Sequence, residues 1–237
     1  MSLVQNPETI KAFILSFSIV SFGFIFYHVI TNSISNKLRE SKSENNILPV
    51  ILQRIIGIFF FGFSTLTAIL FVLHSNPVFF GTTLPGGKTF VWLLGLSVFI
   101  IPMNYYNSKN NENLAQYPQI RTSEWSVSLL ILSALSWIAY LFAYEFMFRG
   151  FFLFASIPLL GIWPSIILNT AVYSLVHIPK GTKETLGAIP FGILISYLTV
   201  ETGSFWLAFF AHVVLALSNE WFSLTAHPQM SLKSIRK

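Results

Sequence analysis

Four ionisable side chains interrupt the apolar stretches of this sequence. Glu145 and Arg149 lie four residues apart, His177 ends one apolar stretch, and His212 lies inside another. A titratable side chain is costly in lipid unless it is paired or lies in a wet cavity, so each of the four is a candidate functional residue. On a helix, Glu145 and Arg149 share one face as a carboxylate–guanidinium pair, in which each makes the other tolerable.

A glutamate and two histidines from three helices suit hydrolysis. The carboxylate takes a proton from water, while the imidazoles bind Zn²⁺ or another divalent metal, or stabilise an oxyanion. We therefore assign Glu145, His177 and His212 as catalytic candidates and as candidate metal ligands. Two other interpretations stand beside this one: the Glu145–Arg149 pair pins two helices together, or each histidine is a hydrogen-bonded packing residue.

Helices that cross a membrane must position these residues. A span needs about 20 apolar residues, and polar connectors with turn-forming residues separate the apolar runs. The sequence predicts an all-α, polytopic transmembrane bundle with about seven spans, at residues 10–30, 50–73, 89–106, 126–157, 162–178, 186–200 and 204–224. The fourth stretch exceeds one perpendicular span, so we expect it to be tilted, broken or split.

The three candidates are predicted to meet at one depth. At about 1.5 Å per residue, Glu145 lies roughly 18 Å before a turn predicted at residues 156–158, and His177 roughly 23 Å after it. His212 lies roughly 13 Å beyond a turn at Gly203. Because both turns belong to the same predicted face, we expect the three side chains to converge near mid-depth.

Composition excludes a soluble domain. Hydrophobic residues make up 54% of the 237 residues and charged residues 10%, whereas an average soluble domain has roughly 25% charged residues. The net charge is +5, with the basic residues spread over loops and tails, which indicates a lipid bilayer as partner and no nucleic acid. The sequence has no cysteine, so disulfides and thiol catalysis are excluded.

Lysine and arginine are distributed unequally over alternate connectors, and basic loops face the cytoplasm. We therefore predict an integral protein of the bacterial inner (plasma) membrane with its carboxyl terminus in the cytoplasm. One set of alternate connectors holds only Lys11 and Lys88. The other set holds Lys37, Arg39, Lys42, Lys109, Arg121, Lys180, Lys183, Lys233, Arg236 and Lys237.

The order of the polar residues resembles the CPBP family, which comprises the type II CAAX prenyl endopeptidases and the bacteriocin-processing, Abi-type intramembrane proteases. The resemblance covers roughly residues 124–224 and rests on residues 145–152, residues 173–177 and His212. It implies an all-helical membrane metalloendopeptidase or glutamate protease. In the family, the first motif supplies the glutamate that activates water, and the histidines complete the site.

Two positions depart from the family pattern. Tyr144 stands where the family has the first of two adjacent glutamates, and Ala216 stands where the third motif has asparagine. Asn219 lies seven residues after His212, on nearly the same helix face. We expect Glu145 to serve as the base in place of the missing glutamate. The supporting residues are then Arg149, Tyr144, Tyr173 and Asn219.

Three functions compete. The first is a CPBP-type endopeptidase that hydrolyses a membrane-embedded, membrane-associated or prenylated peptide. The alternative is a catalytically impaired pseudoprotease that acts as a membrane scaffold or immunity-like protein, because Tyr144 and Ala216 replace usual motif residues. A small transporter with a proton relay is the third, and the sequence shows no inverted repeat to favour it.

We expect three parts in the chain. Residues 1–123 form amino-terminal transmembrane helices and loops, residues 124–224 form the protease-like core, and residues 225–237 form a polar tail.

Overall fold

The computed structural model describes residues 6–40 and 46–233. Within them the chain is almost entirely helical, as the predicted all-α class requires. In chain order the elements are α1 (Pro7–Glu40), α2 (Ile47–Gly57), η1 (Ile58–Phe63), α3 (Ser64–Thr67), η2 (Ala68–Val72), η3 (Pro77–Phe80), α4 (Gly87–Asn107), α5 (Asn111–Leu114), β1 (Glu124–Trp125), α6 (Val127–Glu145), η4 (Phe146–Phe152), α7 (Leu153–Leu160), α8 (Ile162–Leu175), η5 (Ile178–Lys180), α9 (Thr182–Thr202), α10 (Trp206–Ala226) and β2 (Ser231–Leu232).

Long apolar helices confirm the polytopic membrane class. Among the described residues, six helices are long and apolar enough to cross a membrane, at Pro7–Ile34, Ile47–Val72, Gly87–Asn107, Val127–Leu160, Thr182–Thr202 and Trp206–Ala226. The fifth predicted span is present as a shorter apolar helix, Ile162–Leu175. Large apolar side chains such as Phe71, Val91 and Phe99 lie exposed on the outer helix faces, where lipid is the solvent that they require.

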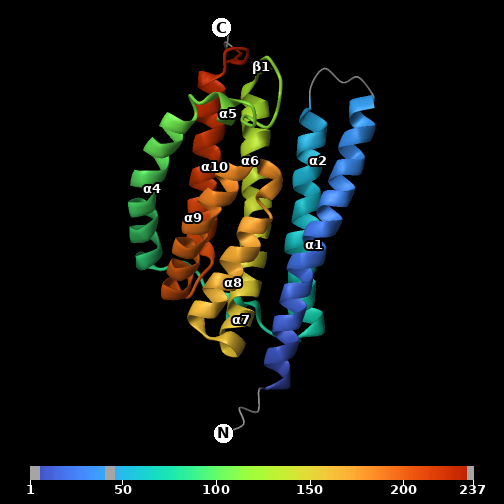
Figure 1. Ribbon diagram of the computed structural model, residues 1–237, viewed down its shortest axis with the longest axis vertical. Helices are drawn as coiled ribbons and strands as arrows, with labels where there is room; N and C mark the ends of the chain where they lie inside the picture. The colour runs from blue at the N-terminus through green and yellow to red at the C-terminus, as the bar shows by residue number, and fades with distance from the viewer. Residues whose placement is uncertain (1–5, 41–45, 234–237) are drawn as a thin grey trace.

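The helices form one elongated bundle. α10 packs against α4, α6 and α9, α8 packs against α9, and α2 packs against α6 and α1. Figure 1 shows the start of α1 and the end of α10 at opposite ends of the bundle. At the carboxyl-terminal end, β1 and β2 pair in parallel, with Glu124 opposite Ser231 and Trp125 opposite Leu232, and this pairing ties the loop before α6 to the tail.

The fourth span is one continuous helical stretch, α6–η4–α7, whose middle part has π-helical geometry over Phe146–Phe152. The turn predicted at residues 156–158 is wrong. Pro158 lies inside α7, and the chain turns at Gly161, which has φ of 85°. A proline removes one backbone donor without necessarily ending a membrane helix, whereas a left-handed φ strongly favours glycine. Glycine therefore decided the position of the turn.

Candidate functional site

Glu145 lies at the junction of α6 and the π-helical segment η4, in the fourth span. Its side chain is buried, and so is that of Arg149. The Nη1 atom of Arg149 donates to both carboxylate oxygens of Glu145, at 3.2 and 3.1 Å. The predicted pair on one helix face is thus present. π-helical turns are frequent at functional sites, and this one begins directly after the candidate glutamate.

His212 comes from α10 and meets the same carboxylate. Its Nδ1 atom lies 2.6 Å from Oε1 of Glu145. A carboxylate paired with a guanidinium is an acceptor, so we assign the proton to Nδ1 of His212, which donates it to Glu145. In this tautomer, the Nε2 atom of His212 carries a lone pair that can take up a proton.

His177 follows the end of α8 and is also buried. Its Nδ1 atom lies 2.7 Å from the carbonyl oxygen of Tyr173, which can only accept. Tyr173 also contacts Arg149, whose guanidinium carbon lies 4.0 Å from the centre of the tyrosine ring. Among the described residues, no hydrogen bond joins His177 to Glu145 or His212.

A cavity of about 640 Å³ separates these helices, and it decides which groups a ligand can reach. Its wall includes both His177 and His212, together with Tyr144 and Tyr173, whereas Glu145 is not part of the wall. The cavity thus brings the two predicted histidines to one space. Glu145 lies behind His212, so a substrate in the cavity would meet the imidazole before the carboxylate.

The two positions that depart from the family pattern, Tyr144 and Ala216, both lie on the cavity wall, as does Asn219. The hydroxyl of Tyr144 is buried and has no hydrogen-bond partner in the described part of the chain, and the same holds for Oδ1 of Asn219. Both side chains therefore carry polar groups that the protein itself leaves unsatisfied, and a bound molecule could satisfy them.

The predicted metal site is not assembled as a three-ligand group. In the part of the chain that the structure describes, no three His, Asp or Glu side chains lie close enough together to hold a metal ion. Glu145 is occupied by Arg149 and His212, which leaves one ring nitrogen on each histidine. Zn²⁺ sites ordinarily use three or four protein ligands. The metal stays a prediction, and no step below runs through it.

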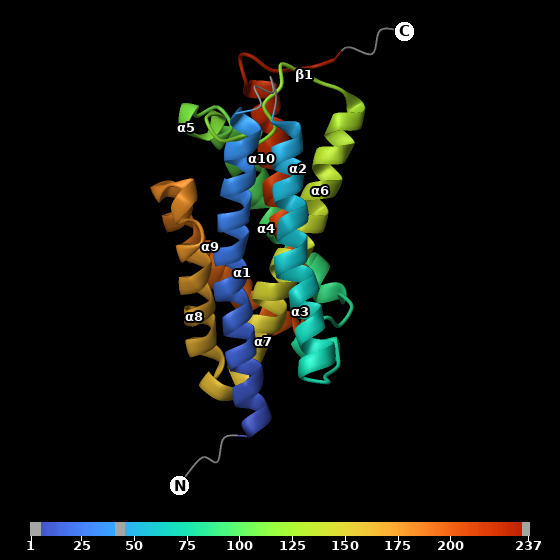
Figure 2. The ribbon, with the colours of Figure 1, turned by 90° about the vertical axis from the view of Figure 1, so that its right-hand side faces the viewer.

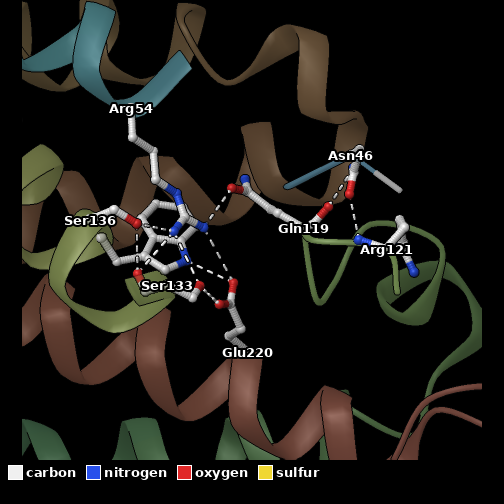
Figure 3. A network of polar contacts seen from close by, with 8 residues as sticks. Asn46, Arg54, Gln119, Arg121, Ser133, Ser136 and Glu220 are labelled. Atoms are coloured by element: carbon white, nitrogen blue, oxygen red, sulfur yellow. Dashed lines mark hydrogen bonds and ion pairs between the residues drawn. The ribbon is translucent and has the colours of Figure 1, made fainter. Parts of the chain in front are cut away.

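A second buried ion pair escaped the sequence analysis. Arg54 of α2 lies with its Nη2 atom 3.5 Å from Oε2 of Glu220 on α10, and both side chains are buried. Figure 3 shows that Ser133 and Ser136 surround the guanidinium. Both charged residues interrupt apolar runs, so the rule that selected Glu145 and Arg149 would have found them too.

Trp137 completes this second cluster. Its Nε1 atom donates to Oε2 of Glu220 at 2.7 Å, and the guanidinium of Arg54 lies 4.2 Å from the centre of its ring. Trp137 also lines the cavity. The Arg54–Glu220 ion pair therefore holds Trp137, a residue of the cavity wall, in place.

The fold and the site together define a polytopic helical membrane protein with a buried glutamate–arginine–histidine cluster beside an internal cavity. Residues 125–218 match the family model described as type II CAAX prenyl endopeptidase Rce1-like. The match confirms the resemblance to the CPBP family and contains Glu145, His177 and His212. Searches of curated proteins and of solved structures gave no match.

Proposed function

We propose that this protein is an intramembrane endopeptidase that hydrolyses a membrane-associated or prenylated peptide. The observation that carries the proposal is the contact of 2.6 Å between His212 Nδ1 and Glu145 Oε1, within the segment that matches the protease family. A histidine oriented by a buried carboxylate and facing a cavity is suited to act as a general base.

In the proposed reaction, Nε2 of His212 takes a proton from a water molecule while the water oxygen attacks the peptide carbonyl carbon. Glu145 holds the imidazole in the required tautomer and stabilises its protonated form, and Arg149 keeps Glu145 ionised. His212 then returns the proton to the nitrogen of the leaving amine as the carbon–nitrogen bond breaks. The role proposed for Glu145 therefore changes from water activator to orienting carboxylate.

The negative charge on the carbonyl oxygen needs donors. The hydroxyl of Tyr144 and the amide of Asn219 line the cavity and are the proposed donors. His177 offers Nε2 to the same space, where it would accept a hydrogen bond from the attacking water. These assignments give each of the three cavity residues a role that a substitution can test separately.

The test is cleavage of membrane-anchored peptides by the protein in liposomes. We expect His212→Ala to lower the cleavage rate by at least about 100-fold, the usual contribution of a general base, and Glu145→Gln to lower it by a similar factor. His74→Ala is the matched control, because His74 is not among the residues that line the cavity. Retention of full activity by His212→Ala would overturn the mechanism. Loss of activity on chelation would show that a metal takes part.

A second candidate function is binding without cleavage, as in a pseudoprotease that acts as a membrane scaffold or immunity-like protein. The observation that favours it is the presence of Tyr144 and Ala216 on the cavity wall, where the family pattern has a glutamate and an asparagine. If the natural chain binds a peptide without cutting it, and Tyr144→Glu with Ala216→Asn creates cleavage, this second candidate holds.

We also propose that the protein lies in a bacterial inner membrane with its carboxyl-terminal end in the cytoplasm. Lys109, Arg121 and Lys233 belong to segments at that end of the bundle, whereas Lys11 and Lys88 belong to the other end (Figure 1). Loops rich in lysine and arginine stay in the cytoplasm. Lys42, Arg236 and Lys237, which also contributed to the sequence argument, lie outside the described residues.

A further inference from the structure

The loop between α4 and α6 passes over one end of the cavity. We call residues 108–126 the strap. Asn113 and Tyr117 of the strap line the cavity on one side, and Lys180 of η5 and Glu184 of α9 line it on the other. Figure 2 shows α5, which belongs to the strap, beyond the end of the α8–α9 hairpin. The mouth of the cavity at this end therefore lies between the strap and α9.

The carboxyl-terminal half of the strap is firmly anchored. Gln119 accepts a hydrogen bond from Nη2 of Arg54 at 3.1 Å, which connects the strap to the buried ion pair with Glu220 (Figure 3). Asn46 donates to the carbonyl oxygen of Gln119 at 2.8 Å and accepts from the backbone nitrogen of Arg121 at 2.5 Å. Trp125 is buried. Moving this half would break several buried contacts at once.

The amino-terminal half of the strap meets η5 and α9 through polar side chains, and Tyr117 of this half also packs against the apolar core. Lys183 pairs with Glu112, and their side chains are 72% and 68% exposed. Gln116 donates to the carbonyl oxygen of Lys180 in η5 at 2.8 Å, and Tyr117 and Glu184 line the same end of the cavity. Exposed ion pairs contribute little and are screened by salt, so the Glu112–Lys183 pair holds this half against α9 only weakly.

The amino-terminal half of the strap is held on the side away from α9. Arg121, in the anchored half, donates to the carbonyl oxygens of Leu114 and Ala115, at 3.0 and 2.6 Å, and Asn113 donates to the hydroxyl of Ser223 on α10 at 2.7 Å. Burial, with the nearby carboxylate of Glu184, raises the pKa of Tyr117, so its phenol stays protonated. The contacts thus hold this segment on the side of Arg121 and α10 and leave a weakly held edge, with the exposed Glu112–Lys183 pair, against α9.

We propose that residues 111–117 form a lid that swings away from α9 and so controls the entry of polar molecules, such as a peptide chain, from the aqueous side into the cavity that holds His177 and His212. The structure describes the closed state. The proposal concerns access alone and does not depend on whether a peptide is cleaved inside.

Access can be measured with a single thiol, because the natural sequence has no cysteine. Ala216→Cys places the thiol on the cavity wall. Its rate of reaction with a sulfonate-bearing methanethiosulfonate is measured in nanodiscs, where the charged reagent reacts from the aqueous phase. Ser123→Cys, at an exposed position in the fixed half of the strap, serves as the control for reagent and protein quality.

Breaking the lid contact should speed the reaction inside the cavity. We expect Lys183→Glu, which faces Glu112 with a like charge, to raise the rate at Ala216→Cys about two- to fivefold, the range that an exposed ion pair can supply. The charge swap Glu112→Lys with Lys183→Glu should restore the original rate. Raised salt should speed the reaction in the natural background, and the rate at Ser123→Cys should stay constant throughout.

Equal rates at Ala216→Cys in the natural, Lys183→Glu and charge-swapped backgrounds would overturn the proposal. If Lys183→Glu does not fold, Gln116→Ala removes a neighbouring contact and carries the same expectation and the same contrary outcome. Because labelling reports entry, a protein that labels as expected but cleaves no peptide would refute the proposed function and leave the lid intact.

Discussion

Glu145 has two partners with different tasks. Arg149 neutralises it from one turn along the same helix, and His212 reaches it from α10. A buried carboxylate that loses its counter-charge is costly, since the remaining ion has no water to solvate it. Each member of the pair therefore depends on the other for its burial, besides being part of the candidate site.

We predict that Arg149→Leu lowers the free energy of unfolding by about 3–5 kcal/mol, because it leaves Glu145 buried without its guanidinium. Arg149→Leu combined with Glu145→Leu should recover much of this loss, since no isolated charge remains. Thermal unfolding in detergent measures both. A single variant as stable as the natural protein would show that Glu145 does not depend on Arg149.

At the scale of helices, α6 and α10 run antiparallel, and polar contacts join them at two levels. Glu145 meets His212 at one level, and Trp137, together with Ser133, meets Glu220 at the other. Eight residues separate the two levels on either helix, which is about 12 Å. Because the two contacts have the same spacing on both helices, they fix the axial register of α10 against α6. This register sets the position of His212 relative to Glu145.

We predict that Glu220→Ala destabilises the bundle by about 3–5 kcal/mol, because Arg54 then keeps a buried charge without its partner. The double variant Arg54→Met with Glu220→Leu should be clearly more stable than Glu220→Ala. Glu201→Ala, at an exposed position near the end of α9, is the matched control and should change stability by less than about 0.5 kcal/mol. Equal unfolding temperatures for Glu220→Ala and Glu201→Ala would contradict this role.

For the whole molecule, the unequal distribution of basic residues between the two ends of the bundle makes a prediction about orientation. A reporter fused after Lys237 should behave as cytoplasmic, because the connectors at that end carry most of the lysine and arginine. An alkaline phosphatase fusion, which is active only outside the cytoplasm, should be inactive, and a fluorescent protein fusion should be bright. The reverse pattern would refute the orientation.

The amino-acid sequence by itself determined that lipid surrounds this protein, and it determined where most of the helices lie. Apolar runs of sufficient length can only be membrane helices, and the predicted stretches correspond to helices in the structure. The predicted ends were less accurate: α1 extends to Glu40 rather than residue 30, since a polar segment outside lipid can continue a helix. The three-part division of the chain stays a prediction.

The tertiary structure alone decided which polar group faces the cavity. Spacing along the chain places Glu145 and Arg149 on one helix face, but it cannot tell whether that face points to a cavity or to another helix. His212, from a distant part of the sequence, stands between Glu145 and the open space. The partnership of Arg54 with Glu220 likewise depends on packing between α2 and α10. The rotation of each helix about its own axis, and the helices against which it packs, depend on side-chain packing throughout the bundle. Local sequence patterns do not contain that information.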